Sequence, residues 1–333
     1  MTRPGRGRPC VGFLGVGWIG RGRMEAMLAT GAVEAAAIVE PSPEMLAGAR
    51  ALAPNAAVCG SYDEMLALGL DGIVIATPSA LHAAQATRAL EAGAAVFCQK
   101  PLGRDAREVA GVVAAARAAD RLLAVDLSYR FTGAATAIAP LAREGALGEV
   151  QLVELTFHNA YGPDKPWFYD KAQAGGGCVV DLGVHLVDLA LWTLGWPEVT
   201  NVDATLYAGG RPLAGDAVED LAIATLRLAD GPVVRLACSW RLHAGRDAII
   251  EAAFYGRQGA VALRNVGGSF LDFEAHRFDG TAATRLTAPP DEWSGRAAAD
   301  WAVRLAGGAR FDREAERLTT VAEVLDRIYE AAR

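Results

Sequence analysis

The stretch Gly15-Val16-Gly17-Trp18-Ile19-Gly20 decides the fold class of this 333-residue chain. It lies between an apolar run, Val11 to Leu14, and a segment with the apolar spacing of a helix, Arg21 to Thr30. Glycines at this spacing between a strand and a helix make a tight turn and let backbone N–H groups approach a pyrophosphate at the positive end of the helix dipole. The stretch therefore predicts a dinucleotide-binding site that includes Gly15, Gly17, Trp18, Ile19 and Gly20.

A second predicted strand, Val33 to Val39, ends beside an acidic residue, Glu40, which follows Gly20 by twenty positions. A carboxylate there can accept hydrogen bonds from both ribose hydroxyls of NAD, and it would repel the extra phosphate of NADP. The alternative interpretation is a solvated side chain before the turn at Pro41. We expect NAD as the cofactor, with NADP less favoured.

The length favours two domains, and the composition is that of a globular protein, with 52% hydrophobic and 21% charged residues. The formal charge of −7 gives no electrostatic reason to expect nucleic acid or an anionic membrane as a partner. We find no signal-peptide pattern and no run of about 18 uninterrupted apolar residues. The five cysteines are scattered, without CxxC or zinc-ligand spacing. We therefore expect a cytoplasmic protein with buried thiols and no metal.

From Cys10 to about Asp126, apolar strand-length runs alternate with helical segments. Strands that are apolar on both faces and separated by helices predict a parallel, doubly wound sheet, in which ligands bind at the carboxyl ends of the strands. Thr77 or Ser79 is expected to cap the next helix, and the Lys100–Pro101 bond is one that can be cis. The informative strand ends are Thr77-Pro78-Ser79, followed by His82, then Gln99-Lys100-Pro101, and Ser128-Tyr129-Arg130-Phe131.

After a predicted helix at Thr132 to Glu144, the pattern changes to long alternating strands joined by short turns such as Ala229-Asp230-Gly231. This pattern predicts an antiparallel sheet, followed by helices at Asp291 to Leu305 and Arg313 to Ala332. We predict a dinucleotide-binding domain over residues 8–130 and a substrate-binding and oligomerisation domain over residues 131–333. The strand candidates are Leu152 to Asn159, Val199 to Tyr207, Val218 to Leu228, Pro232 to Trp240, Ala248 to Tyr255, Ala260 to Arg264 and Phe270 to Phe278.

One predicted helix in this second part, Cys178 to Trp192, carries Asp181, His185 and Asp188 among apolar residues. Spacings of four and three place these side chains on roughly one helical face, and burying such a face is costly unless it has a purpose. A structural Asp–His pair is the alternative interpretation. A metal site has little support, because no third ligand is evident.

The glycine stretch, the segment Thr77 to His82, the turn Gln99-Lys100-Pro101 and the segment Asp181 to His185 together resemble the Gfo/Idh/MocA family of oxidoreductases. The resemblance covers nearly the whole chain in order. It implies a Rossmann domain followed by an α/β domain with a large, mostly antiparallel open sheet that often mediates dimers or tetramers. It also implies hydride transfer between a nicotinamide and a secondary alcohol of a sugar or cyclitol.

Carried over by position, the catalytic group is Lys100, Asp181 and His185. A histidine suits proton removal from a hydroxyl near neutral pH, a lysine ammonium can stabilise the developing alkoxide and relay a proton, and Asp181 can position the substrate. Family members usually have Glu-Lys-Pro, so Gln99 removes a negative charge beside Lys100. The expected cofactor contacts beyond the glycine stretch are Glu40, Thr77, Pro78, Ser79, His82, Gln99 and Lys100.

Substrate contacts are expected from residues near the domain junction and on the loop before the Asp181 helix. Arg130 has an equally weighted alternative, an interdomain salt bridge. The set is Tyr129, Arg130, His158, Trp167, Asp181 and His185.

These features predict an NAD-dependent sugar or cyclitol dehydrogenase or ketoreductase that assembles as a homodimer or homotetramer through the C-terminal sheet. Two alternatives stay open: an NAD-dependent glycosidase of the same family, and a regulator that senses NAD(P) without catalysis. The joint presence of Lys100, Asp181 and His185 argues against the regulator.

Overall fold

The computed structural model describes residues 7–229 and 231–332. Three parts of the sequence lie outside the described residues: residues 1–6, Asp230 of the predicted turn, and Arg333 at the end of the predicted second domain. The chain divides into two compact units. The first runs up to Asp126 and resumes from Gly295 to Thr319, and the second comprises Leu127–Ser294 and the residues from Thr320 onward.

This division differs from the predicted boundary at residue 130, because residues 295–319 fold with the first unit. The helix α9, Arg296–Ala306, packs there against α1 and β5. Its Trp301 lies against Phe97, and a Cβ added at Gly72 would come within 2.7 Å of the Trp301 ring. A late helix that returns to an early sheet has no signal in local periodicity, which explains the difference.

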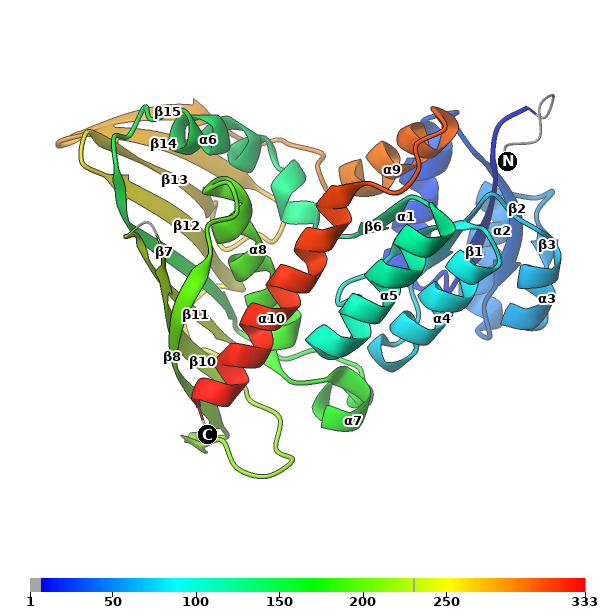
Figure 1. Cartoon of the computed structure of the whole chain (residues 1–333), viewed down its shortest axis with the longest axis horizontal. Helices are drawn as coiled ribbons and strands as arrows, with labels where there is room; N and C mark the ends of the chain where they lie inside the picture. The colour runs from blue at the N-terminus through cyan, green and yellow to red at the C-terminus, as the bar shows by residue number, and fades with distance from the viewer. Residues whose placement is uncertain (1–6, 230, 333) are drawn as a thin grey trace. The chain divides into compact units, whose positions relative to one another are not determined.

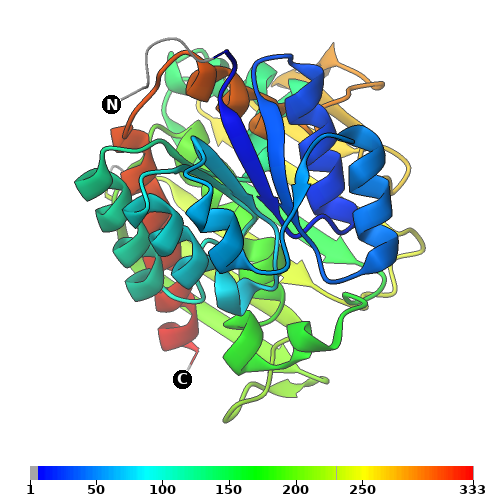
Figure 2. The same cartoon turned by 90° about the vertical axis from the view of Figure 1, so that its right-hand side faces the viewer.

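The first unit contains a six-stranded sheet with the order β3-β2-β1-β4-β5-β6, and all of its pairings are parallel. Figure 2 shows this sheet with α1 and α2 on one side and α4 and α5 on the other. The predicted doubly wound parallel sheet is confirmed. The strands are β1 Cys10–Leu14, β2 Glu34–Val39, β3 Ala57–Val58, β4 Gly72–Ile75, β5 Ala95–Cys98 and β6 Leu123–Val125; the helices are α1 Trp18–Ala29, α2 Pro43–Leu52, α3 Tyr62–Ala67, α4 Ser79–Glu91 and α5 Ala106–Ala119.

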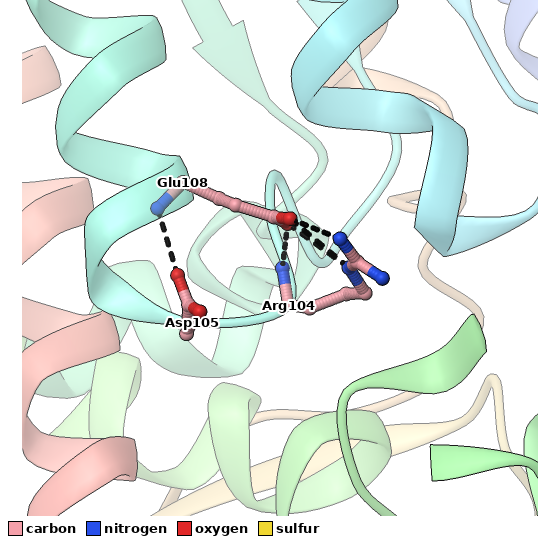
Figure 3. A network of polar contacts seen from close by, with 3 residues as sticks. All are labelled: Arg104, Asp105 and Glu108. Atoms are coloured by element: carbon pink, nitrogen blue, oxygen red, sulfur yellow. Dashed lines mark hydrogen bonds and ion pairs between the residues drawn. The ribbon is translucent and has the colours of Figure 1, made fainter. Parts of the chain in front are cut away.

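The loop from Pro101 to Asp105 is fixed at the start of α5 by reciprocal hydrogen bonds (Figure 3). The Asp105 carboxylate accepts from the Glu108 backbone N–H at 2.8 Å, and the Glu108 carboxylate accepts from the Arg104 backbone N–H at 2.8 Å and from its guanidinium. The first bond satisfies a backbone donor that the helix start otherwise leaves unpaired, and the others fix the residue that precedes the N-cap. The loop after Lys100 therefore has a defined path.

The second unit contains a nine-stranded sheet with the order β15-β14-β13-β12-β7-β11-β10-β8-β9. The β11–β7 pair is parallel and the other pairs are antiparallel, so the predicted mostly antiparallel sheet is confirmed. The short strands β9 and β15 had no counterpart in the sequence-based prediction. The strands are β7 Val150–Asn159, β8 Val199–Ala208, β9 Arg211–Pro212, β10 Leu221–Leu228, β11 Val233–Ser239, β12 Ala248–Gly256, β13 Gly259–Asn265, β14 Phe273–Asp279 and β15 Ala282–Thr287.

Helices α6 and α8 lie on one face of this sheet, and the core of the unit is between them and the strands (Figure 1). The segment Lys171–Thr193, which includes α8, is long and apolar enough to cross a membrane by composition alone, with a mean hydropathy of 1.5. However, 89% of its most apolar window is buried inside the fold, as in a core helix. The helical elements are η1 Ser128–Phe131, α6 Gly133–Arg143, η2 Pro166–Tyr169, α7 Lys171–Ala174, η3 Val179–Gly183 and α8 Val184–Thr193, with η4 Arg313–Ala315 and α10 Glu316–Ala331 closing the chain.

Replacing Asp105 with alanine removes the side-chain cap of α5 and should lower the free energy of unfolding by about 1 kcal/mol. Asp105→Ser, which keeps a capping oxygen, should retain most of that stability. Urea unfolding followed by circular dichroism measures both variants, and equal midpoints for the alanine variant and the wild type would contradict a stabilising cap.

Candidate functional site

The glycine turn between β1 and α1 is shaped by close backbone approaches. Gly15 has a φ of +82°, and a Cβ there would lie 2.6 Å from the Ala76 carbonyl oxygen. A Cβ at Gly20 would lie 2.3 Å from the Gly15 carbonyl oxygen, so the helix packs directly on the turn. A Cβ at Gly17 would meet nothing within 4 Å. The turn is thus tightly built on two sides and open at Gly17, where the helix N-terminus can receive a phosphate.

Glu40 follows β2 and holds this turn. Its Oε2 accepts a hydrogen bond from the Val16 backbone N–H at 2.8 Å, and its Oε1 accepts from the Ser42 backbone N–H at 3.0 Å. A carboxylate has about four lone-pair positions, so these two bonds leave acceptor capacity for ribose hydroxyls. Trp18 and Ile19 beside it are exposed at 77% and 36%. The hydrogen bond from Val16 to Glu40 therefore brings Glu40 next to the glycine turn, as expected for residues that hold one cofactor.

The turn after β4 differs from the sequence-based prediction of a Thr77 or Ser79 cap. The N-cap of α4 is Pro78, which offers no side-chain cap. Thr77 instead donates its hydroxyl to Gln85 Oε1 at 2.6 Å, in the second turn of α4, and Ser79 is buried. The prediction was wrong because a Thr-Pro-Ser sequence places the proline, rather than either hydroxyl, at the position where the helix begins.

The turn after β5 carries Lys100, and the Lys100–Pro101 peptide bond is cis. The preceding Gln99 donates from its amide to Oδ2 of Asp126, and Arg23 of α1 donates to the same oxygen. Asp126 is 2% exposed. Gln99 thus supplies a neutral donor to a buried, arginine-paired carboxylate, whereas a glutamate at that position would place a second negative charge against Asp126.

In the second unit, a buried carboxylate fixes the start of the helix that carries Asp181 and His185. Glu219 Oε1 accepts from the backbone N–H groups of Gly177 and Val179, each at 2.9 Å, and from the Tyr329 hydroxyl at 2.8 Å. Burial raises the pKa of Glu219, and the hydrogen bonds oppose that rise. Glu219 was missed in the sequence, where it falls inside the predicted strand Val218 to Leu228; the observed strand β10 begins two residues later, at Leu221.

The helix itself begins with a π-helical turn, η3, which contains Asp181, and continues as the α-helix α8, which contains His185. Asp181 accepts a hydrogen bond from the Trp240 indole N–H at 3.0 Å. The His185 ring is 7% exposed and lies edge-on to the Tyr129 ring, with the ring centroids 4.7 Å apart. Trp240, which follows β11, was also missed, although an aromatic residue at a strand end was its available signal.

Two predicted substrate residues serve the packing of this helix. Tyr129 is 9% exposed and contacts the rings of Phe157 and His185, so it lies in an aromatic cluster beneath the site. Burial raises the pKa of Tyr129, and the charge of Asp181 adds to this effect.

Arg130 forms an ion pair with Asp188, with Nε 2.7 Å from Oδ2, and its guanidinium lies over the Trp196 ring. Burial raises the pKa of Asp188, and Arg130 opposes the rise. Asp188 is therefore paired with Arg130, whereas Asp181 accepts a hydrogen bond from Trp240. Arg130 thus forms a salt bridge within the second unit, and its predicted substrate contact stays a prediction.

His158 lies apart from Asp181 and His185. The neighbouring Phe157 faces α8 and contacts the His185 ring, and alternation along β7 directs His158 to the opposite face of the sheet. There its Nδ1 lies 2.8 Å from the Ser239 hydroxyl. The predicted substrate contact of His158 is therefore not supported by its placement.

The predicted contact Trp167 belongs to an aromatic group at the Trp240 end of the sheet. The Trp167 ring stacks on Phe168 at 3.8 Å, and Phe168 and Tyr169 lie edge-on to Trp240. Tyr169 is 40% exposed. Aromatic faces next to a carboxylate form a surface on which a sugar ring can stack while its hydroxyls hydrogen-bond.

Lys100 belongs to the first unit, and Asp181 and His185 belong to the second. Among residues 7–229 and 231–332, no group of three His, Cys, Asp or Glu side chains is arranged to hold a metal ion. Three of the five cysteines, Cys98, Cys178 and Cys238, are buried. The first unit presents an open helix start that can accept a phosphate, and the second presents a carboxylate and an imidazole on a buried helix.

The 3-2-1-4-5-6 parallel sheet with an open glycine turn, joined to a large open sheet that carries an Asp/His helix, defines a two-domain dinucleotide-dependent oxidoreductase. Residues 10–127 match "Oxidoreductase family, NAD-binding Rossmann fold", and residues 136–262 match "GFO/IDH/MocA C-terminal domain". The chain belongs to the GFO/IDH/MocA family of oxidoreductases, and its first unit is an NAD-binding Rossmann domain.

Similar proteins agree with this assignment. The chain is 33% identical to a putative UDP-kanosamine synthase oxidoreductase subunit of Amycolatopsis mediterranei, over 75% of this chain and 74% of that protein. It is 31% identical to inositol 2-dehydrogenase of Rhizobium meliloti, over 76% of this chain and 75% of that protein. Among solved structures, GenD2 from gentamicin A biosynthesis in complex with NAD is 26% identical, with a TM-score of 0.79 over 100% of this chain and 97% of that one. The predicted family, fold class, enzyme class and NAD cofactor are confirmed.

Replacing Trp240 with phenylalanine keeps the ring but removes the N–H donated to Asp181. Because hydrogen bonds to charged groups contribute about 1.5–3 kcal/mol, kcat/KM should fall by roughly ten- to hundredfold if this bond orients Asp181 for the reaction. Steady-state kinetics with a substrate that the wild type turns over tests this. Trp293→Phe removes a comparable bond to the Leu271 carbonyl and serves as the control; equal losses in both variants would point to general packing damage.

Proposed function

We propose that this protein is an NAD-dependent dehydrogenase that transfers a hydride between the nicotinamide and a secondary alcohol or ketone of a sugar, cyclitol or sugar derivative. The observation that carries the proposal is the Asp181–His185 helix, whose polar side chains are set rigidly in an otherwise apolar, buried segment. The aromatic group at Trp240 and Trp167 supports a ring-shaped substrate. Relatives named D-glucoside 3-dehydrogenase and inositol 2-dehydrogenase support the substrate class.

The residues present fit NAD. The open position at Gly17 and the N-terminus of α1 would hold the pyrophosphate, and Glu40 has lone pairs left for the adenosine ribose. When bound, NAD supplies the hydride acceptor.

The chain's own residues handle the proton. His185 is the general acid/base that removes the proton from the substrate hydroxyl during oxidation and returns it during reduction. Lys100 stabilises the alkoxide oxygen as the proton leaves, and Asp181 accepts a hydrogen bond from a substrate hydroxyl. A buried, closely packed helix is a suitable support for this work, because small displacements of a catalytic group cost rate.

Replacing Lys100 with methionine should abolish turnover and leave NADH binding nearly unchanged, because the charge acts on the alkoxide rather than on the cofactor. NAD-coupled absorbance against free sugars, inositols and sugar nucleotides, in both directions, measures turnover. Quenching of tryptophan fluorescence by NADH measures binding. Lys165→Met, which removes an exposed lysine, is the matched control. Full turnover by the Lys100 variant would overturn the assignment.

The same assay separates the alternatives. Release of p-nitrophenol from p-nitrophenyl glycosides without net NADH would identify a glycosidase, and NADH binding without turnover on any substrate would favour a regulator. A reaction that produces NADH in proportion to an oxidised sugar supports the dehydrogenase.

We also propose that the protein is cytoplasmic and forms a homodimer or homotetramer through the face of the nine-stranded sheet opposite α8. Along β10, alternate residues are exposed on this face, and Ile223 is 51% exposed; Tyr255 of β12 is 39% exposed. Apolar side chains between polar ones on a broad sheet are suited to self-association. None of the described cysteines forms a disulfide, which is consistent with a reducing compartment.

Replacing Ile223 with aspartate should shift the oligomer to a smaller species, because a charge would be buried in the interface. Light scattering coupled to size-exclusion chromatography measures the mass. Leu68→Asp, at a 50% exposed leucine in the first unit, should leave the mass unchanged. An unaltered mass for the Ile223 variant would rule out this face.

A further inference from the structure

His82 on α4 is a buried histidine with a backbone carbonyl at each ring nitrogen. Its side chain is 1% exposed. Nδ1 lies 2.7 Å from the Pro101 carbonyl oxygen, and Nε2 lies 2.7 Å from the Thr77 carbonyl oxygen. This placement differs from the predicted cofactor contact, because both ring nitrogens already face the protein backbone.

Carbonyl oxygens only accept hydrogen bonds, so each contact needs an N–H on the ring. A neutral imidazole carries one N–H and one lone pair, and only the imidazolium carries two N–H groups. In the neutral ring, one nitrogen lone pair would face a carbonyl oxygen at hydrogen-bond distance, which is unfavourable. The geometry is therefore fully satisfied only when His82 holds a second proton.

The two carbonyls belong to the turns that carry candidate cofactor and catalytic residues. Thr77 begins the turn after β4, and its hydroxyl is itself bonded to Gln85 on α4. Pro101 directly follows Lys100 in the turn after β5. His82 thus joins two adjacent strand ends of the parallel sheet, with the site lysine one residue from one of its contacts.

The electrostatic setting of the ring works against the second proton. Burial lowers the pKa of His82, the two carbonyls act in the opposite direction, and the positive charge of Lys100 adds to the lowering. Helix α4 packs against α3, α5, β4 and β5. From α3, the Tyr62 hydroxyl donates to the Gln85 carbonyl, and Asp63 pairs with Arg88 of α4. In the described part of the chain, the charged group that acts on the ring is Lys100.

We propose that His82 is a positioning residue that ties the turns after β4 and β5 together through both ring nitrogens, and that its second proton is linked to the charge of Lys100. When Lys100 is charged, the imidazolium is disfavoured and one of the two turns is held less firmly. When the lysine charge is removed, the second proton binds more readily and both turns are held.

The importance of this link for turnover rests on the proposed function, since it is there that Lys100 acts on the substrate. The proton link itself does not. It concerns two groups in the first unit and is measured without substrate or turnover.

Nitrogen-15 NMR of histidine-labelled protein tests the link, because the ring nitrogen shifts distinguish the neutral tautomers from the imidazolium. The chain has five histidines, and His82→Gln identifies the His82 signals by their loss. In the wild type, both His82 nitrogens should reach the protonated state as the pH falls. In Lys100→Met, the midpoint should move upward by at least several tenths of a pH unit. Lys165→Met, remote from this turn in sequence, should leave it in place.

A His82 ring that keeps one neutral tautomer down to the lowest pH at which the protein stays folded, in both the wild type and Lys100→Met, would overturn the proposal. An unchanged midpoint in Lys100→Met would overturn the link to the lysine.

A second measurement tests the positioning of the turns. Hydrogen exchange, after correction for its intrinsic pH dependence, should slow in segments 77–79 and 99–103 as the wild type passes below the His82 midpoint. This slowing should be absent in His82→Gln, whose single amide nitrogen cannot reach both carbonyls, and present in His243→Gln, which changes an exposed histidine. Slowing in all three proteins would show that another group holds the turns.

Discussion

The buried carboxylate of Glu219 is the interaction on which the arrangement of the second unit depends. Removing a carboxylate from water is costly, and here the cost is offset by two backbone N–H groups at the start of a helix and by the Tyr329 hydroxyl. The chain passes so close that a Cβ at Gly177 would lie 2.0 Å from the Glu219 carbonyl oxygen. This contact fixes where the helix begins, and hence where Asp181 and His185 stand.

The first unit uses the same principle, in which one side chain holds backbone groups at several strand ends. Glu40 accepts from the glycine turn and from the residue that caps α2, whereas His82 contacts the carbonyls of two later turns. Gln99 and Arg23 meet on Asp126. Each group ties loops that parallel strands bring to one edge of the sheet, so polar contacts restrain the connections there.

The sequence predicted the features that depend on local pattern. Glycine spacing predicted the turn at Gly15 because the strand, turn and helix are contiguous, and a lysine before proline marked the turn after β5. It could not predict contacts that depend on sheet order. The parallel pairing of β11 with β7 brings Ser239 beside His158 and delivers Trp240 to Asp181. The π-helical turn at Asp181 and the pairing of Asp188 with Arg130 likewise depend on partners far away in sequence.

Because the helix from Val179 to Thr193 is buried, substitutions on it and substitutions on the exposed loops near it should have different effects. Side chains on that helix are core residues as well as site residues, so most substitutions there act on folding before they act on chemistry. The aromatic segment 166–169 and residues 241–247 are more exposed, with Tyr169 at 40%. Diversification toward new substrates is therefore easier at these loops, and a library that leaves the helix untouched would sample substrate preference with the least loss of folded protein.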